Sequence, residues 1–205
     1  DKVEAALQQI SPELQALVKV CYQKEQLGTA HAVTQALPQV DAASQVIVLY
    51  GDTPLTPKVE LERLLAALNE GAALSLLTAE LNNPAGYGRI VRSASGALQG
   101  IVEDKDASPE QKAIREINTG MIATTGALLN EYLPQIGNNN AQGEYYLTDL
   151  AGLLVQAGKQ VDGIKAAPEN IDLLSGINNK QQLAFVERLY QERAANQLLM
   201  DGLTL

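Results

Sequence analysis

The feature that most limits the fold of this chain is an unbroken apolar run, Val46-Ile47-Val48-Leu49-Tyr50. The run is short, rich in β-branched residues, and offers no polar face that could meet water. Such a run is typical of a strand covered on both faces, as in a parallel sheet with helices above and below it. The sequence therefore favours an α/β fold.

Strand-like segments alternate with segments of helical periodicity along the chain. Helices are expected at 3–10, 31–37, 57–70, 126–133, 145–157 and 180–202. Strands are expected at 17–21, 46–50, 74–77, 88–92, 97–104, 117–123 and 160–166. This alternation predicts a mostly parallel α/β sheet with helices on both faces, into which the strands at 88–92 and 97–104 form a small antiparallel insertion.

The chain reads as one domain with a terminal helix, because no repeat or long linker divides it. We expect the domain over 1–177 and a C-terminal linker helix over 178–205. In open α/β sheets the first strand and its following loop usually carry the ligand phosphates. This chain begins on a predicted helix, so the first strand of such a sheet is expected to be missing.

Composition excludes several classes of protein. The 205 residues include 15 Lys and Arg against 24 Asp and Glu, a net charge of −9, which argues against nucleic-acid binding. No apolar run approaches 18 residues, and the first ten residues do not form a secretory signal, so no membrane association is expected. A single cysteine, Cys21, fits a reducing cytoplasm and is expected to be buried as a small apolar side chain.

Asp52 is the first candidate for chemistry, because it follows the apolar run directly in Tyr50-Gly51-Asp52-Thr53-Pro54. Ligands of α/β sheets bind beyond the carboxyl ends of the strands. A carboxylate there suits Mg²⁺, which binds through one or two protein groups and substrate phosphates. The alternative is an Asp that only opens a turn.

Two polar segments are weaker candidates. The segment from Gln23 to His31 joins a predicted strand to a helix through Gly28, and a glutamine amide can read a pyrimidine edge. His31 itself is expected to be structural. The segments 138–149 and 175–179 are otherwise ordinary solvated loops with helix-capping residues.

Taken in order, these segments resemble the sugar-1-phosphate nucleotidyltransferases. The resemblance rests on QLGTAHA at 26–32, LYGDTPL at 49–55, PAGYGRI at 84–90, IVEDKDA at 101–107, EINTG at 116–120 and GINN at 176–179. The stretch NNNAQGEYYLTD at 138–149 is similar to the uridyltransferase half of the bacterial bifunctional N-acetylglucosamine-1-phosphate uridyltransferases/glucosamine-1-phosphate acetyltransferases. The resemblance covers nearly the whole chain.

The resemblance implies a Rossmann-like three-layer αβα nucleotidyltransferase domain. It also implies a reaction of UTP with N-acetylglucosamine 1-phosphate that gives UDP-N-acetylglucosamine, a cell-wall precursor, and pyrophosphate. The family's whole proteins also acetylate glucosamine 1-phosphate and form homotrimers. The trimers are built largely by a β-helix that this chain lacks, so a monomer or weak assembly is expected here.

Residue roles follow from the resemblance position by position. Asp52 and Asn178 would hold the catalytic Mg²⁺ cofactor. The residues expected to contact substrate are Gln23, Gly28 and Thr29 for uracil, Tyr50 and Gly51 for the nucleotide and sugar, and Gly88, Glu103, Asn118, Tyr145 and Thr148 for the N-acetylglucosamine.

The chain also departs from the family. The family's opening glycine-rich loop, L-A-A-G-x-G-T-R-M, with its phosphate-binding backbone, Arg and Lys, is not in this sequence. We therefore expect negligible turnover from these residues alone. Two alternatives stay open, namely a non-catalytic nucleotide-sugar-binding module and another sugar-1-phosphate nucleotidyltransferase.

Overall fold

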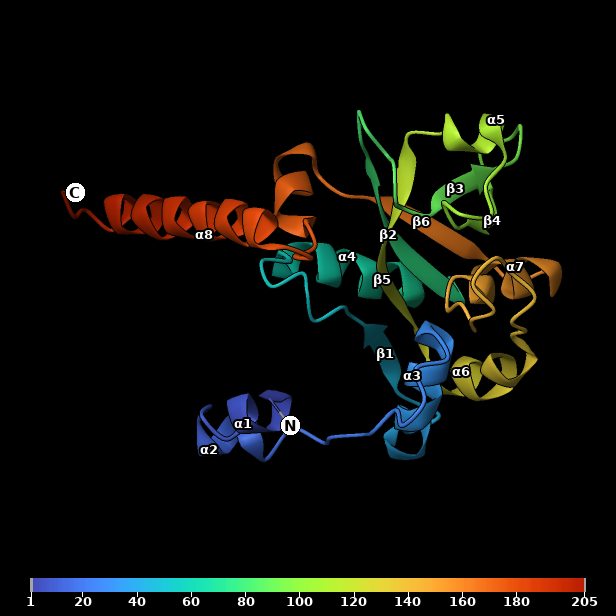
Figure 1. The fold of residues 1–205 in the computed structure, drawn as a ribbon, viewed down its shortest axis with the longest axis horizontal. Coiled ribbons are helices and arrows are strands. Elements are labelled where there is room, and N and C mark those ends of the chain that lie inside the picture. The colour runs from blue at the N-terminus through green and yellow to red at the C-terminus, as the bar shows by residue number, and fades with distance from the viewer. Residues whose placement is uncertain (1, 205) are drawn as a thin grey trace.

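The computed structural model of the chain describes residues 2–204, so Asp1 and Leu205, the outer ends of the two predicted segments, lie outside the described residues. Its centre is a sheet of six strands (Figure 1). They are β1 (Gln45–Val48), β2 (Leu74–Glu80), β3 (Arg89–Arg92), β4 (Leu98–Val102), β5 (Glu116–Thr125) and β6 (Val161–Lys165). The strand order is β4-β3-β5-β2-β6, and β1 also pairs with β5.

The sheet is mixed, because β5 runs antiparallel to β1, β2 and β3. Strand β2 is parallel to β6, so β1, β2, β3 and β6 share one direction while β4 and β5 oppose it. The α/β fold with most strands in one direction is thus confirmed. The sequence did not reveal that β5 lies between β1 and β2, which leaves β2–β6 as the parallel pair among the described strands.

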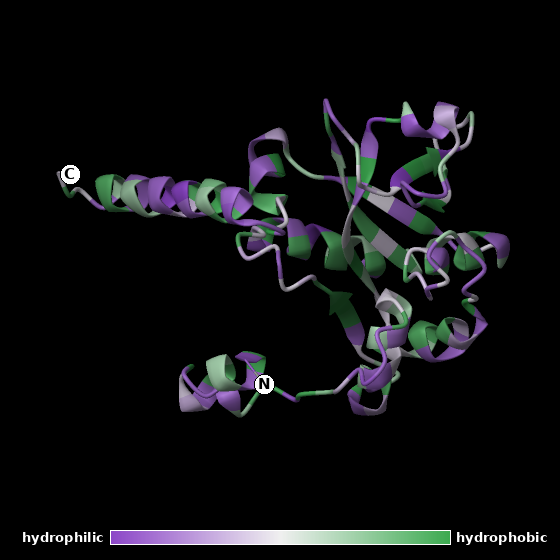
Figure 2. Cartoon of the chain, viewed as in Figure 1, coloured by the Kyte–Doolittle hydropathy of each residue, from purple (hydrophilic) through white to green (hydrophobic). Residues whose placement is uncertain are grey.

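Helices cover both faces of the sheet. Leu76 of β2 faces a core shared with α3 (Thr29–Ala36), α6 (Gly126–Tyr132) and α7 (Asp149–Gln156). Leu77, the next residue, faces a second core with Leu64 of α4 (Lys58–Asn69). Successive strand residues point to opposite faces, so the two cores require three layers, as expected. Figure 2 shows apolar residues gathered on the strands and on the helices beside them.

The prediction of a strand at 17–21 is wrong. Leu17 lies in a turn in which its N–H donates to the Leu14 carbonyl, the rest of the segment is irregular and pairs with none of the described strands, and Leu17 is 80% exposed. A strand needs a neighbour for its backbone groups, and here the segment only connects α1 (Lys2–Leu7) and α2 (Pro12–Gln15) to the body. Cys21 lies in it and is exposed and free, so its expected burial is also wrong.

Other helices differ in extent from the sequence prediction, and α1 ends at Leu7 rather than at residue 10. Helix α7 begins at Asp149 rather than at 145, because the backbone of Tyr145 bonds to Leu27 and Ala30 instead. Helix α8 (Lys180–Met200) ends two residues before the predicted 202. It projects from the body (Figure 1), and Val186 is its buried residue.

A one-turn helix, α5 (Pro109–Lys112), follows β4.

Short 3₁₀ helices at Leu37–Gln39, Leu133–Gln135 and Pro168–Leu174 complete the described fold. The last of them, η3, leads into the loop before α8. Within residues 2–204, no helix has the length and apolar character needed to cross a membrane.

Candidate active site

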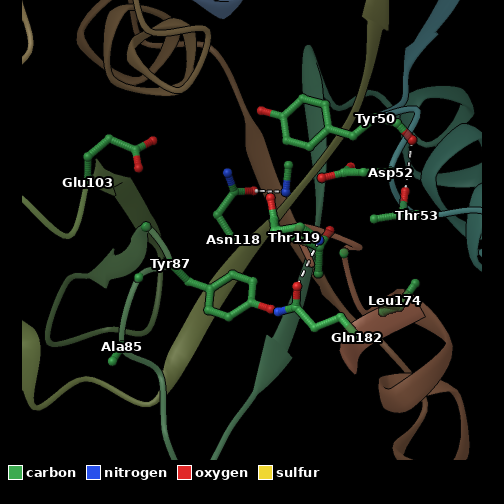
Figure 3. Close-up of a pocket in the computed structure, with 15 residues that line it drawn as sticks. Tyr50, Asp52, Thr53, Ala85, Tyr87, Glu103, Asn118, Thr119, Leu174 and Gln182 are labelled. Atoms are coloured by element: carbon green, nitrogen blue, oxygen red, sulfur yellow. Dashed lines mark hydrogen bonds between the residues drawn. The ribbon is translucent and has the colours of Figure 1, made fainter. Parts of the chain in front are cut away.

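A cleft of about 350 Å³ opens beside the ends of β1, β3 and β4 (Figure 3). Asp52 follows β1, Gly88 directly precedes β3, and Glu103 directly follows β4. Asn118 comes from β5, and Asn178 from the loop before α8. The lining residues are Tyr50, Asp52, Thr53, Ala85, Gly86, Tyr87, Gly88, Glu103, Asn118, Thr119, Gly120, Leu174, Gly176, Asn178 and Gln182.

Asp52 and Asn178, the expected metal ligands, lie together around Gly176. A Cβ on Gly176 would sit 3.3 Å from Asp52 Oδ2 and 3.7 Å from Asn178 Nδ2. The Ile177 N–H donates to the Asp52 carbonyl at 2.9 Å, which ties the two loops together. The missing side chain of Gly176 thus leaves a cradle between a carboxylate and an amide.

The donor chemistry of this cradle fits Mg²⁺. A carboxylate and an amide carbonyl are hard oxygen ligands, and rotation of the Asn178 amide presents its oxygen to the cradle. Within residues 2–204 no group of three or more His, Cys, Asp or Glu side chains could hold a metal. The cradle itself offers two side-chain ligands, and Mg²⁺ commonly completes such a site with water and substrate phosphates.

Three of the expected sugar-binding residues, Gly88, Glu103 and Asn118, form the opposite wall of the cleft. The Asn118 N–H donates to the Gly88 carbonyl at 2.8 Å, and a Cβ on Gly88 would lie 3.4 Å from Glu103 Oε2. The Thr148 hydroxyl donates to Glu103 Oε1 at 2.9 Å. Gly88 therefore permits close approach of its backbone to an oriented carboxylate.

The Glu103 carboxylate is unusual in its electrostatics. Burial raises its pKa, the Thr148 hydrogen bond offsets part of this, and the neighbouring carboxylates of Asp149, Asp106 and Asp104 raise it further. Such a carboxylate gains from partners that donate hydrogen bonds, and sugar hydroxyls are partners of that kind.

Tyr50 lies between the two walls. Its ring packs on Gly120, where a Cβ would overlap the ring and where φ is +88°. Gly120 belongs to an irregularity of β5, opposite Leu76 to Thr78 of β2, and its N–H donates to Asn118 Oδ1 at 3.1 Å. Burial, then Glu103 and Asp52, raise the pKa of the Tyr50 phenol, so it stays protonated at neutral pH.

Gln23, Gly28, Thr29 and Tyr145 do not line this cleft. Gly28, with φ +115°, passes so close to Tyr145 that a Cβ would sit 2.5 Å from its carbonyl oxygen. Thr29 Oγ1 accepts from Leu147 N–H at 2.9 Å, and Gln23 Nε2 donates to the Gly28 carbonyl at 3.0 Å. These residues form a separate cluster at the start of α3. The expected contacts of Gln23, Gly28 and Thr29 with uracil, and of Tyr145 with the sugar, stay predictions.

Two other expected residues stand at the margin. Gly51 is exposed between Tyr50 and Asp52 and does not line the cleft. Thr148 reaches the site through Glu103. His31 is bonded to Gln23 and Gln35, as the structural interpretation predicts.

Sequence reasoning missed several lining residues, including Tyr87, Thr119 and Gln182. Tyr87 and Thr119 belong to segments that carried the resemblance, so their neighbours pointed to them. Gln182 gave no signal, because a glutamine in the first turn of a helix usually faces solvent.

Charge in the cleft has one sign. The described lining residues include Asp52 and Glu103 but neither Lys nor Arg. A phosphate bound by these residues would therefore need a cation from elsewhere, which agrees with the metal-binding chemistry of the cradle.

Comparison with known proteins gives the class of this domain. The family described as nucleotidyl transferase matches residues 2–190, and the chain belongs to this family. The chain is 50% identical over its full length to the bifunctional protein GlmU of Burkholderia lata, and 47% identical to that of Marinobacter nauticus. It spans only 43% of the length of each of these relatives.

A solved structure agrees on the fold. The CMP:2-keto-3-deoxy-manno-octonic acid synthetase complexed with CTP superimposes with a TM-score of 0.57 at 16% identity. The match covers 80% of this chain and 68% of that one, which shows a shared fold. The resemblance inferred from the motifs is thus confirmed at the level of the family.

Proposed function

We propose that this chain provides the sites for uridylyl transfer from UTP to N-acetylglucosamine 1-phosphate, with UDP-N-acetylglucosamine and pyrophosphate as products. The observation that carries the proposal is the meeting of six expected residues in one cleft. They are Tyr50, Asp52, Gly88, Glu103, Asn118 and Asn178. The similarity to GlmU proteins over the full chain supports the same substrates.

The metal in this proposal is Mg²⁺, held by Asp52 and Asn178 around Gly176. When bound, it neutralises phosphate charge at the reacting centre. The reaction is an in-line attack of a sugar-phosphate oxygen on the α-phosphorus of UTP, with pyrophosphate as leaving group, so no protein nucleophile is needed. Asp52 and Asn178 then act by fixing where the phosphates lie.

The sugar is held by the wall opposite this cradle. Glu103, oriented by Thr148, accepts hydrogen bonds from sugar hydroxyls, and Gly88 and Asn118 offer backbone and amide groups to the N-acetyl substituent. Tyr145 is proposed to close the sugar side.

The nucleotide is assigned to the remaining expected residues. In this proposal Tyr50 and Gly51 contact the nucleotide and sugar, while Gln23, Gly28 and Thr29 receive the uracil. A reducing compartment such as the cytoplasm is supported by the exposed, free thiol of Cys21.

The test is calorimetric titration of UDP-N-acetylglucosamine into the chain with and without Mg²⁺. We expect saturable binding that Asp52→Ala weakens roughly tenfold, and only when metal is present. Asp201→Ala, at the exposed end of α8, is the matched control and should bind like the unaltered chain.

Three outcomes separate the alternatives. Failure of a folded chain to bind contradicts the proposed substrate site. Binding that ignores both Mg²⁺ and Asp52→Ala favours a non-catalytic nucleotide-sugar-binding module. Tighter binding of UDP-glucose than of UDP-N-acetylglucosamine favours another sugar-1-phosphate nucleotidyltransferase.

A further inference from the structure

Gln182 connects the first turn of α8 to the cleft. Its Oε1 accepts a hydrogen bond from the Asn178 N–H at 2.7 Å, and the residue lines the cleft (Figure 3). Its own N–H donates to Asn179 Oδ1 at 2.9 Å, which caps the helix. The start of α8 therefore resembles a capping box, in which the N-cap side chain and the side chain three residues later each bond to a backbone N–H. Here the Gln182 side chain bonds to Asn178, the residue before the N-cap.

We infer that Gln182 is a positioning residue that sets the Asn178 amide opposite the Asp52 carboxylate for metal binding. The inference rests on the proposed function, in which these two side chains hold the metal. It assigns to α8 a part in the site that a linker helix would not have.

The loop around Asn178 is held at two neighbouring points. Ile177 N–H bonds to the Asp52 carbonyl, and Asn178 N–H bonds to Gln182. Two fixed peptide groups in succession restrict the rotation of the backbone that carries the Asn178 side chain. Without the Gln182 acceptor, the backbone N–H of Asn178 would turn toward water. The side-chain amide of Asn178 would then lose its fixed direction.

Helix α8 is itself anchored to the loop that carries Asp52. Val186, one turn beyond Gln182, is 5% exposed. Arg193 Nη1, two turns further on, donates to the Leu55 carbonyl at 3.5 Å. The helix thus packs beside the loop on which one metal ligand lies, and its first turn orients the other.

A purely structural role of Gln182 makes a different prediction. A cap that only stabilises α8 would, when removed, lower helix content and leave metal affinity unchanged. Removal of a positioning residue would lower the affinity for the metal and leave ligand binding without metal unchanged. The two readouts therefore distinguish the roles.

The experiment uses Mn²⁺ as a spectroscopic substitute for Mg²⁺, with free Mn²⁺ measured by its paramagnetic resonance signal. The full 205-residue chain is titrated with Mn²⁺ at saturating UDP-N-acetylglucosamine. Gln182→Met keeps the length of the side chain without a strong acceptor, and Gln182→Ala serves as a second variant that favours the helix.

We expect both variants to raise the Mn²⁺ dissociation constant roughly tenfold, the lower range for loss of an orienting partner. Gln182→Glu retains an acceptor and should restore at least the unaltered affinity. Gln181→Ala changes the exposed neighbouring glutamine and should stay within about twofold of the unaltered chain.

The failures are distinguishable. Retention of Mn²⁺ by the unaltered chain with no change in either Gln182 variant overturns this inference and leaves the proposed function standing. If the unaltered chain binds UDP-N-acetylglucosamine but no Mn²⁺, the metal role and this inference fall together.

Discussion

Gly176 separates the two side chains to which the metal is assigned. Replacement by Ala would place a methyl group 3.3 Å from Asp52 Oδ2, a contact tighter than ordinary packing. The φ of Gly176 lies outside the left-handed region, so the backbone itself accepts Ala. We expect Gly176→Ala to raise the Mg²⁺ concentration needed for UDP-N-acetylglucosamine binding about tenfold, by displacing the carboxylate.

The matched control for this change is Gly137→Ala. A Cβ there meets nothing within 4 Å, so the substitution should leave the Mg²⁺ dependence unaltered. Calorimetry at several Mg²⁺ concentrations measures both variants. An unchanged Mg²⁺ requirement in Gly176→Ala would show that the metal does not lie between Asp52 and Asn178.

The ionised carboxylate of Glu103 is expected to favour sugar binding but to destabilise the folded chain. Burial first, and nearby carboxylates next, raise the pKa of Glu103 in the folded chain above its unfolded value. Its contribution to stability is therefore full below the ordinary pKa of 4.5 and is lost as the pH rises through the folded pKa. Glu103→Gln removes this loss. The thermal midpoint of the variant should therefore exceed that of the unaltered chain by more at pH 7 than at pH 4. The same substitution should weaken sugar binding.

The measurement is thermal unfolding of Glu103→Gln and of the unaltered chain at both pH values. Glu131→Gln, at an exposed position of α6, is the control and should show no such pH-dependent gain. Equal midpoint shifts for the two variants would mean that burial of Glu103 does not destabilise the ionised form.

At this scale the sequence pointed to residues of one cleft where they belonged to a distinctive segment, and their roles stay predictions. Asp52, Glu103 and Asn118 are far apart in the chain, and the cleft brings them together. It could not reveal Gln182, because the role of that glutamine depends on a hydrogen bond to a backbone group. It also could not show that Gly28 and Tyr145 contact each other, since no periodicity reports a contact between such distant segments.

At the scale of elements, Glu60 joins α4 to the 3₁₀ helix η3. Its fully buried carboxylate accepts from Ala167 N–H at 3.0 Å, Asn170 Nδ2 at 2.8 Å and Arg63 Nη1 at 2.6 Å. Glu60→Ala leaves these donors without their acceptor, so it should lower the free energy of unfolding by about 3 kcal/mol. Glu62→Ala breaks only an exposed pair with Lys58 and should cost under about 0.5 kcal/mol.

Chemical denaturation of both variants across acidic pH tests this role. Burial alone would raise the pKa of Glu60, but its hydrogen bonds from Asn170, Ala167 and Arg63 hold it below the ordinary 4.5. The contribution of Glu60 is therefore present above pH 4.5 and is lost as the pH falls through the lowered pKa. The difference between Glu60→Ala and the unaltered chain should shrink on acidification, and a constant difference would contradict this account.

We expect a protease to cut first in the irregular segment at 17–22. Its backbone lacks a strand partner in the described part of the chain, and Lys19 within it is exposed. Brief trypsin treatment should cleave after Lys19 before it cleaves within the sheet, as mass spectrometry of the products would show. Prior cleavage after Arg89 or Arg92 of β3 would mean that the sheet opens more readily than this segment.

The error in this segment has a physical cause. Its apolar and β-branched residues favour an extended strand, but the segment is irregular and begins with a turn at Leu17. A strand also requires an adjacent strand, and the sequence of one segment carries no information on its neighbour. For β1, β2 and β6 the prediction succeeded because sheet partners are present.

At the scale of the whole molecule, the sequence predicted the layers better than the order of strands. The two cores follow from alternating residues in β2, which local patterns capture. The insertion of β5 between β1 and β2 pairs residues that are far apart in the chain, and at its farthest it joins Gln45 to Thr125, about 80 residues later. Nothing in the local pattern of either strand specifies that pairing.

This placement of β5 bears on how the chain folds as it leaves the ribosome. Strands β1 and β2 emerge early, yet their common partner begins only at Glu116. Until then both present open edges and uncovered apolar faces, a state in which nascent chains associate wrongly or recruit chaperones. Native pairing of β1 and β2 must therefore wait for synthesis of the strand that lies between them.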